Sequence, residues 1–125
     1  MNELQLINIG IELLEDGYSV KWTPSQRTAS GVITLSYPDY DARLIEALRS
    51  ASQLVGTDFE YVDNVDAVKN LNVSEMTREQ LSTLLTWVQR SERFCDGAID
   101  GFVKDGRVLQ ALRRAVEIEC SSKGG

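Results

Sequence analysis

The chain has 125 residues, of which 42% are apolar and 26% are charged, and its net charge is −6. This length and apolar share predict one folded domain over residues 1–125 and exclude a disordered chain. Histidine is absent and there are two cysteines. That composition excludes the common zinc sites, disulfide frameworks and histidine-based catalysis, so we expect no metal and no cofactor.

The sequence contains no signal for a membrane or for export. No uncharged apolar run approaches the ~20 residues that span a bilayer. The first ten residues, MNELQLINIG, lack the basic region and cleavage site of a signal peptide. We therefore expect a cytoplasmic protein that does not associate with membranes.

Charge is distributed unevenly along the chain. Residues 1–76 carry 12 acidic and 5 basic side chains, whereas residues 77–125 carry 7 acidic and 8 basic ones. Any surface that attracts anions is therefore expected in the C-terminal third. Direct nucleic-acid binding is disfavoured because it needs a larger basic stripe than this sequence offers.

The first half of the chain alternates helix and strand signals. Apolar residues at helical spacing predict a helix over 2–16, and β-branched and aromatic residues predict strands over 18–23 and 31–37. A second helical stripe covers 44–55, and a third β-like stretch covers 58–62. Because a right-handed crossover would make that last strand parallel, we expect a small mixed sheet of about three strands.

The second half is helical throughout. Thr77 and Gln80 form a capping-box pattern ahead of a helix that ends near 90–93. Asp96 is placed to cap a brief helix, and a last helix follows Gly106. The predicted fold is α+β, with helices packed on one sheet face, an all-helical C-terminal third and a flexible tail over 121–125.

Cys95 and Phe94 are expected in the core. Cys95 and Cys120 are 25 positions apart, with no CxxC motif, and a free cysteine most often behaves as a small buried hydrophobe. A reactive thiol at Cys95 is the alternative. Phe94 is expected to anchor the neighbouring helix junction.

The densest polar cluster is Arg90-Ser91-Glu92-Arg93-Phe94-Cys95-Asp96-Gly97, at the predicted junction of two helices. If Asp96 opens the second helix, the amides of its first turn point towards the bend, where Arg90 and Arg93 could add planar donors for a carboxylate or phosphate. The alternative is structural, because Arg93 can pair with Glu92 or Asp96 and tie the junction together.

Three further features could take part in a site. Tyr37, Tyr40 and Trp22 could line a base-stacking or protein-contact surface, although strand aromatics usually pack. With histidine absent, a hydrolase would depend on carboxylates such as Glu92 and Asp96, whose arginine neighbours disfavour a general-acid role. A solvated helix face is the expected role of a basic group near the C-terminus, made of Lys104, Arg107, Arg113 and Arg114.

The segments RSERFCDG, GRVLQALRRAVEIE and VITLSYPDY together resemble a bacterial and phage family of unknown function. Its signature is Arg-Gly-Glu-Arg-Phe-Cys-Asp-Gly, followed by a C-terminal helix rich in Leu and Arg, and the resemblance covers roughly residues 31–118. Ser91 departs from the signature, which has Gly there. The positions that the resemblance marks are Arg90, Glu92, Arg93, Phe94, Cys95, Asp96, Gly97, Tyr37, Pro38 and Tyr40.

The sequence favours a small non-catalytic binding module over an enzyme. It would act through a protein partner or a compact anionic ligand, and it could be a phage or mobile-element anti-defence protein that inhibits a host protein through its acidic surface. The alternatives are an oligomeric protein that binds a nucleotide signal and a carboxylate-dependent hydrolase. A homo-oligomer is possible in each case. The residues expected to bind the ligand are Arg90, Glu92, Arg93, Asp96, Tyr37 and Tyr40.

Overall fold

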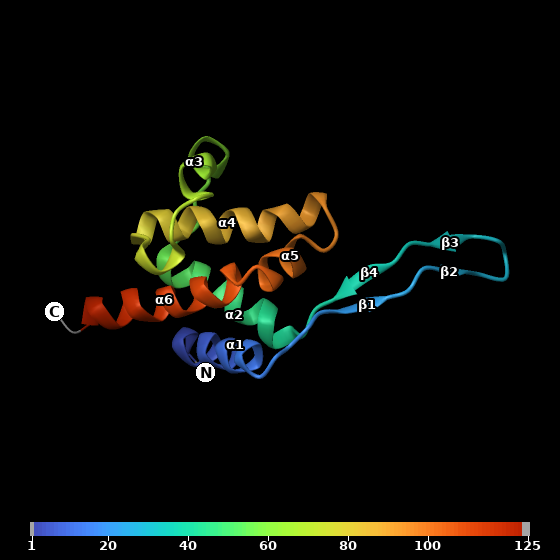
Figure 1. Ribbon diagram of the computed structural model, residues 1–125, viewed down its shortest axis with the longest axis horizontal. Coiled ribbons are helices and arrows are strands. Elements are labelled where there is room, and N and C mark those ends of the chain that lie inside the picture. Colours follow the sequence, from blue (N-terminus) through green and yellow to red (C-terminus); the bar gives the residue numbers. More distant parts are fainter. Residues whose placement is uncertain (1, 124–125) are drawn as a thin grey trace.

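The computed structural model describes residues 2–123 and consists of a helical body with a long β-hairpin that projects from it (Figure 1). The α+β class is therefore confirmed. The elements in chain order are α1 (Glu3–Glu15), β1 (Lys21–Thr23), β2 (Gln26–Arg27), β3 (Ile33–Thr34), β4 (Tyr37–Asp39), α2 (Ala42–Val55), α3 (Tyr61–Val68), the 3₁₀ turn η1 (Val73–Glu75), α4 (Arg78–Phe94), α5 (Ala98–Lys104) and α6 (Arg107–Lys123).

Helix starts follow the capping signals of the sequence. The Thr77 hydroxyl accepts a hydrogen bond from the Gln80 amide at 3.2 Å, and the Gln80 side chain accepts one from the Thr77 amide at 3.0 Å. This reciprocal pair is the predicted capping box, and α4 begins immediately after it. Asn2 and Gln5 form the same arrangement at the start of α1.

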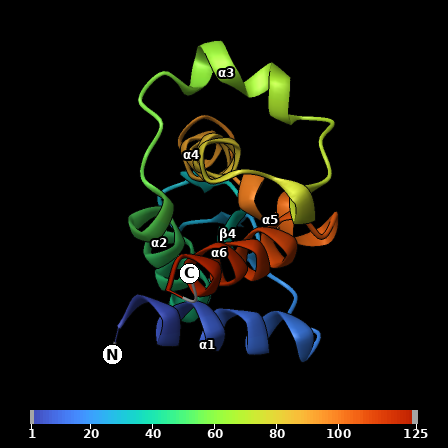
Figure 2. The same ribbon diagram turned by 90° about the vertical axis from the view of Figure 1, so that its left-hand side faces the viewer.

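The core lies between the helices. Apolar side chains at helical spacing from α1, α2, α4 and α6 meet there, and the largest fully buried ones include Ile7, Leu44, Leu48, Leu85 and Leu112. Figure 2 shows α4 almost end-on, with α3 on one side of it and α6 and then α1 on the other. Burial of these side chains is the main source of stability, at about 1.5–3 kcal/mol for each large one.

The hairpin, which we call the arm (Lys21–Asp39), is antiparallel throughout. β1 pairs with β4, and β2 pairs with β3 nearer the tip. The prediction of a mixed sheet with a parallel strand is therefore wrong. Tyr37–Asp39, expected to end the second strand, form β4. Pro38 is tolerated there because a two-stranded ladder leaves edge positions where no N–H is needed.

The strand predicted over 58–62 is also wrong, since this segment is a turn followed by the start of α3. The Asp58 carboxylate accepts a hydrogen bond from the Glu60 amide at 2.9 Å, which closes the turn. The Asp58 amide donates to the Thr86 hydroxyl at 3.0 Å. These bonds attach the segment to α4, and the arm lies far away at the other end of the body (Figure 1).

The sequence predicted that the helices pack on one face of a sheet, but they do not. The arm extends outward and the helices cover one another instead (Figure 1). The C-terminal third is helical, as predicted. A tail was expected over 121–125; α6 continues to Lys123, and residues 124–125 lie outside the described residues. Among residues 2–123, no helix is long and apolar enough to cross a membrane.

Candidate functional site

The junction between α4 and α5 is organised by Glu92. One oxygen of its carboxylate accepts a hydrogen bond from the Gly97 amide at 2.9 Å, and the other accepts one from the Ile99 amide at 3.0 Å. The prediction that Asp96 caps this helix is wrong, since Gly97 is the N-cap and no side chain of its own caps it. The first-turn amides that were expected to bind a ligand are thus occupied by Glu92.

Tyr40 connects this junction to the base of the arm. Its hydroxyl donates to Glu92 Oε1 at 2.5 Å and accepts from the Asp100 amide at 3.2 Å. Burial, and then the hydrogen bond to Glu92, raise the pKa of Tyr40 above its usual value. The hydrogen bonds of Tyr40 to Glu92 and to the Asp100 amide therefore form a structural tie between the base of the arm and α5.

A second tie runs through Trp22. Its indole Nε1 donates to Asp100 Oδ2 at 2.9 Å, and Lys104 forms a salt bridge with the same oxygen at 3.2 Å. Asp100 is 4% exposed, and its other oxygen, Oδ1, has no hydrogen-bond partner in the described part of the chain. Trp22 also lies against Gly97, so the base of the arm is attached to α5 by packing as well as by hydrogen bonds.

Two residues expected under the junction, Phe94 and Cys95, lie on its surface. Phe94, predicted to anchor the core, is 84% exposed. Cys95, also predicted in the core, is exposed, and so is Cys120 on α6. Phe94 is the last residue of α4 and Cys95 is its C-cap, so both lie where the chain leaves the helix and turns back towards α5 (Figure 1). Asp96 is exposed in the same turn.

Arg90 and Arg93 line a cleft between α2 and α4, which we call the arginine groove. Positions 86, 89, 90 and 93 share one face of α4, and positions 45, 48, 49 and 52 share the facing side of α2. Arg49 enters the groove from α2. It escaped the sequence analysis because it lies 41 positions before Arg90 in an otherwise acidic half of the chain.

The groove has two compartments that share Arg49, Gln89 and Arg93. One has a volume of about 280 Å³ and is polar, because Arg90 and several hydroxyl and amide side chains also line it: Ser52, Gln53, Thr57 and Thr86. The other has a volume of about 400 Å³ and is bounded by Ile45, Leu48 and Ile99, together with Glu92. Both compartments thus have a mixed polar and apolar lining, and the second adds the Glu92 carboxylate and the half-buried Ile45.

The three arginines of the groove are outside salt-bridge distance of the carboxylates in residues 2–123, although the charge of Arg90 helps to lower the pKa of Asp58. Within residues 2–123, none of them forms a salt bridge. The Arg90 guanidinium lies 5.0 Å from the centre of the Tyr61 ring, a cation–π contact that brings no counter-charge. By contrast, the four basic residues near the C-terminus, predicted to form a solvated face, are paired with Asp100, Asp105, Glu15 and Glu117.

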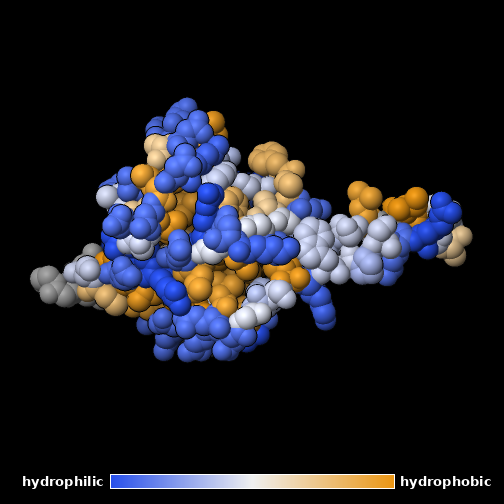
Figure 3. All heavy atoms as spheres, viewed as in Figure 1, coloured by the Kyte–Doolittle hydropathy of each residue, from blue (hydrophilic) through white to orange (hydrophobic). Residues whose placement is uncertain are grey.

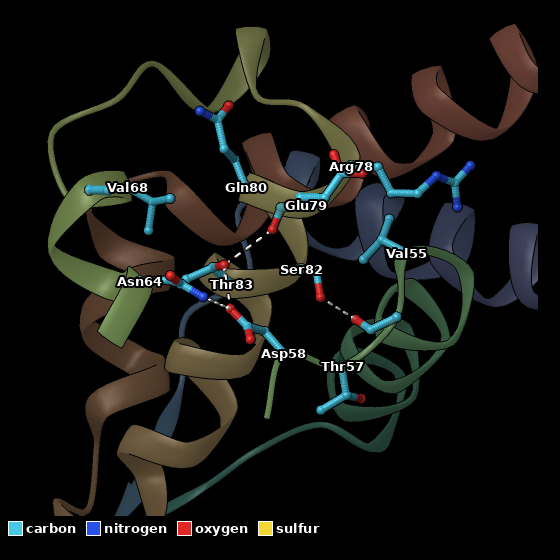
Figure 4. Close-up of a pocket in the computed structure, with 12 residues that line it drawn as sticks. Val55, Thr57, Asp58, Asn64, Val68, Arg78, Glu79, Gln80, Ser82 and Thr83 are labelled. Atoms are coloured by element: carbon cyan, nitrogen blue, oxygen red, sulfur yellow. Dashed lines mark hydrogen bonds between the residues drawn. The ribbon is translucent and has the colours of Figure 1, made fainter. Parts of the chain in front are cut away.

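A larger hollow, about 520 Å³, lies between the end of α2, α3 and the start of α4 (Figure 4). Its polar side chains are bonded to one another: Asp58 Oδ2 accepts from Thr83 at 2.7 Å and from Asn64 at 3.1 Å. These two hydrogen bonds hold the pKa of Asp58 below its ordinary value. Ser82 donates to the Gly56 carbonyl at 2.7 Å. We interpret this hollow as a structural joint, because its polar groups are already paired.

The six residues predicted to bind a ligand fall into separate places. Arg90 and Arg93 line the arginine groove, and Glu92 borders it while holding the junction together. Tyr40 is part of the tie to the arm, whereas Tyr37 lies exposed in the arm and Asp96 in the turn. No group of carboxylate or thiol side chains in residues 2–123 is arranged to hold a metal ion.

Comparison with known families matches residues 3–121 to DUF6508, a family of unknown function. No curated protein matches the chain, and no solved structure does. The match spans nearly the whole chain, from α1 to α6, so the arm, the groove and the helix junction all belong to one family domain.

Proposed function

The chain belongs to the DUF6508 family, whose function is unknown, and from its arginine groove we propose that it is a non-catalytic module that binds a compact anionic ligand. The observation that supports this proposal is the convergence of Arg49, Arg90 and Arg93 on one cleft with no carboxylate paired to them in residues 2–123. Guanidinium groups are planar donors that match the oxygens of phosphate and carboxylate.

The helices hold this cleft open in a defined shape. Gln89 donates to the Ser52 hydroxyl at 2.6 Å and to the Leu85 carbonyl at 3.1 Å, so the two walls are linked below the arginines. The amide of Gln89 is thereby fixed, and the Ser52 hydroxyl keeps its own hydrogen free to donate. An anion in the polar compartment would receive bonds from guanidinium groups and from this hydroxyl.

The second compartment indicates what the anion is attached to. The half-buried Ile45 borders it, while Leu48 and Ile99 are buried beneath it, so a phosphate that carries a small organic group has an apolar contact there that free phosphate would not use. Compartments of about 280 and 400 Å³ lie in the size range of small-ligand sites. A nucleoside monophosphate has this combination, and the groove therefore favours the nucleotide-signal alternative.

The other candidate functions have less support. A hydrolase needs a free carboxylate at the groove, but Glu92 already accepts hydrogen bonds from Tyr40, Gly97 and Ile99. An anti-defence role as an acidic inhibitor stays a prediction, as do the cytoplasmic location, the bacterial or phage origin and the signature at 90–97.

Binding of inorganic phosphate, AMP and adenosine, measured by calorimetry and thermal shift, tests this proposal. AMP is expected to bind most tightly, phosphate more weakly and adenosine most weakly, because only AMP fills both compartments. A ligand at about 100 times its Kd should stabilise the fold by about 2.7 kcal/mol. Failure of both phosphate and AMP to bind at millimolar concentration would contradict the proposal.

Two variants locate the binding site. Arg93→Gln and Arg49→Gln each remove one charge-assisted contact and should weaken AMP binding about 10- to 100-fold, with the melting temperature nearly unchanged. Arg113→Gln is the matched control, because it makes the same change on α6, outside the groove. An unchanged Kd for AMP in Arg93→Gln would exclude the groove.

A further inference from the structure

A carboxylate borders the arginine groove. Among residues 2–123, Glu92 is the single acidic side chain that lines either compartment, and it is half-buried at the border of the second one. A negative charge there repels an anionic ligand and weakens its binding. The capping of α5 accounts for part of what Glu92 does, and its hydrogen bonds show what is left over for a ligand.

The hydrogen bonds of Glu92 leave one acceptor position open. An ionised carboxylate has about four such positions, two on each oxygen. Oε1 uses both of its positions, for the Tyr40 hydroxyl and the Ile99 amide, whereas Oε2 accepts one hydrogen bond within residues 2–123, from the Gly97 amide. Three donors therefore fix the carboxylate in place, and Oε2 can still accept one hydrogen bond from a group in the second compartment.

The charge of the groove decides which kind of donor fits beside Oε2. Three arginines and Glu92 give the groove a net charge of +2. A phosphate monoester carries about −1.5 to −2 at pH 7, so it nearly neutralises the groove. An ammonium group on the same ligand would add a positive charge next to Arg49 and Arg93, whereas a hydroxyl group donates a hydrogen bond without adding charge. A hydroxyl group is therefore the better donor.

We propose that Glu92 Oε2 accepts a hydrogen bond from a ribose hydroxyl, so that the groove prefers ribonucleotides to nucleotides that lack the sugar hydroxyls. This inference rests on the proposed binding of a nucleoside monophosphate. Its sugar is the group next to the phosphate, and the second compartment shares Arg49 and Arg93 with the polar one, so a phosphate at these arginines places the sugar beside Glu92. Acidic side chains recognise ribose hydroxyls in the same way in dinucleotide-binding folds.

Calorimetric titration of the wild-type chain with AMP and with dideoxy-AMP, which lacks both ribose hydroxyls, tests this inference. Dideoxy-AMP should bind about 10- to 100-fold more weakly, because the carboxylate loses water on binding and gains no donor in return. Equal Kd values for the two nucleotides would overturn the inference and leave anion binding at the arginines intact. Failure of AMP itself to bind would overturn the proposed function and this inference together.

Two variants test whether Glu92 is responsible for the preference. The quantity measured is the Kd of dideoxy-AMP divided by the Kd of AMP, in which any loss of binding common to both ligands cancels. Glu92→Gln should lower this ratio several-fold, because a neutral amide replaces the charged acceptor.

Tyr40→Phe is the matched control for damage to the junction. It removes the donor to Oε1 and leaves Oε2 with the Gly97 amide, so the ratio should stay as in the wild type. An unchanged ratio in Glu92→Gln would overturn the inference. So would an equal fall of the ratio in both variants, because the preference would then come from the shape of the junction rather than from Oε2.

Discussion

A single carboxylate, that of Glu92, joins three parts of the molecule. It accepts hydrogen bonds from two backbone amides at the start of α5 and from the hydroxyl of Tyr40, the residue that follows the arm. Hydrogen bonds to a charged group are about twice as strong as neutral ones. The sequence predicted that Glu92 belongs to an important cluster, but its spacing could not tell a ligand contact from a helix cap.

Glu92→Gln should destabilise the fold by about 1–3 kcal/mol, because the neutral amide accepts weaker hydrogen bonds and turns one donor towards groups that are donors themselves. Urea denaturation measures this loss. Glu46→Gln is the control, since Glu46 is exposed on α2 and forms no salt bridge or side-chain hydrogen bond in residues 2–123. Equal stabilities of the two variants would show that the cap contributes nothing.

Asp41 should make stability depend on pH in the acid range. Hydrogen bonds from the Arg43 side chain and then from its backbone lower the pKa of Asp41 from 3.8 to about 2. A lowered folded-state pKa means that this contribution is complete above about pH 4 and is lost as the pH falls towards about 2.

Asp41→Asn should therefore lose less stability than the wild type between pH 4 and pH 2, as measured by urea denaturation at each pH. Asparagine remains a good N-cap residue for α2, so the comparison isolates the charge. The control is Asp96→Asn, because the Asp96 side chain is exposed in a turn and forms no salt bridge within residues 2–123. Parallel pH profiles for the wild type and Asp41→Asn would refute this prediction.

At the scale of elements, the arm depends on one close contact with α5. Gly97 has φ +95°, in the left-handed region that favours glycine, and a Cβ there would lie 2.5 Å from Trp22 Cη2. A side chain at this position would therefore push Trp22 away and strain its hydrogen bond to Asp100. The sequence predicted a junction of two helices around this glycine but not the packing of Trp22, 75 positions earlier, against it.

Gly97→Ala should be more destabilising than Gly106→Ala, and the difference measures the contact. Gly106 has φ +88°, and a Cβ added there would meet no atom within 4 Å, so alanine costs about 1–2 kcal/mol from backbone strain alone. Gly97→Ala adds the overlap with Trp22, which should cost about 1–3 kcal/mol more. Denaturant titration gives both values, and hydrogen exchange of the arm should rise in Gly97→Ala. Equal losses of stability in the two variants would mean that Trp22 moves away from a Cβ at position 97 without any loss of stability.

Helix signals in this sequence predicted the structure better than strand signals did. The helices over 2–16 and 44–55 were predicted well because their apolar stripes and caps are local. The segment 58–62 has β-like residues, yet Asp58 bonds to the turn and to α4 instead. A strand needs a neighbour to pair with, and no other strand lies next to this segment in residues 2–123, so its residue types could not decide its structure.

At the scale of the whole molecule, the body and the arm have different surfaces. The body is acidic and buries most of its apolar residues between helices, with Phe59, Val62 and Phe94 as exposed exceptions, whereas the arm has one charged residue between positions 22 and 38 and exposes most of its apolar side chains (Figure 3). The arginine groove is a product of this packing, because α2 and α4 bring basic residues from an acidic and a basic half of the chain to one cleft.

The sequence by itself determined the α+β class, the helical C-terminal third and the capping box before α4, because helix periodicity and capping are local properties. It also identified residues 90–97 as a polar cluster at a helix junction. Only the tertiary structure decided that Arg49 joins Arg90 and Arg93, that Glu92 caps α5 and that the strands form a projecting arm. Each of these depends on contacts between segments tens of residues apart, which are set by how the helices pack rather than by the order of residues within any one of them.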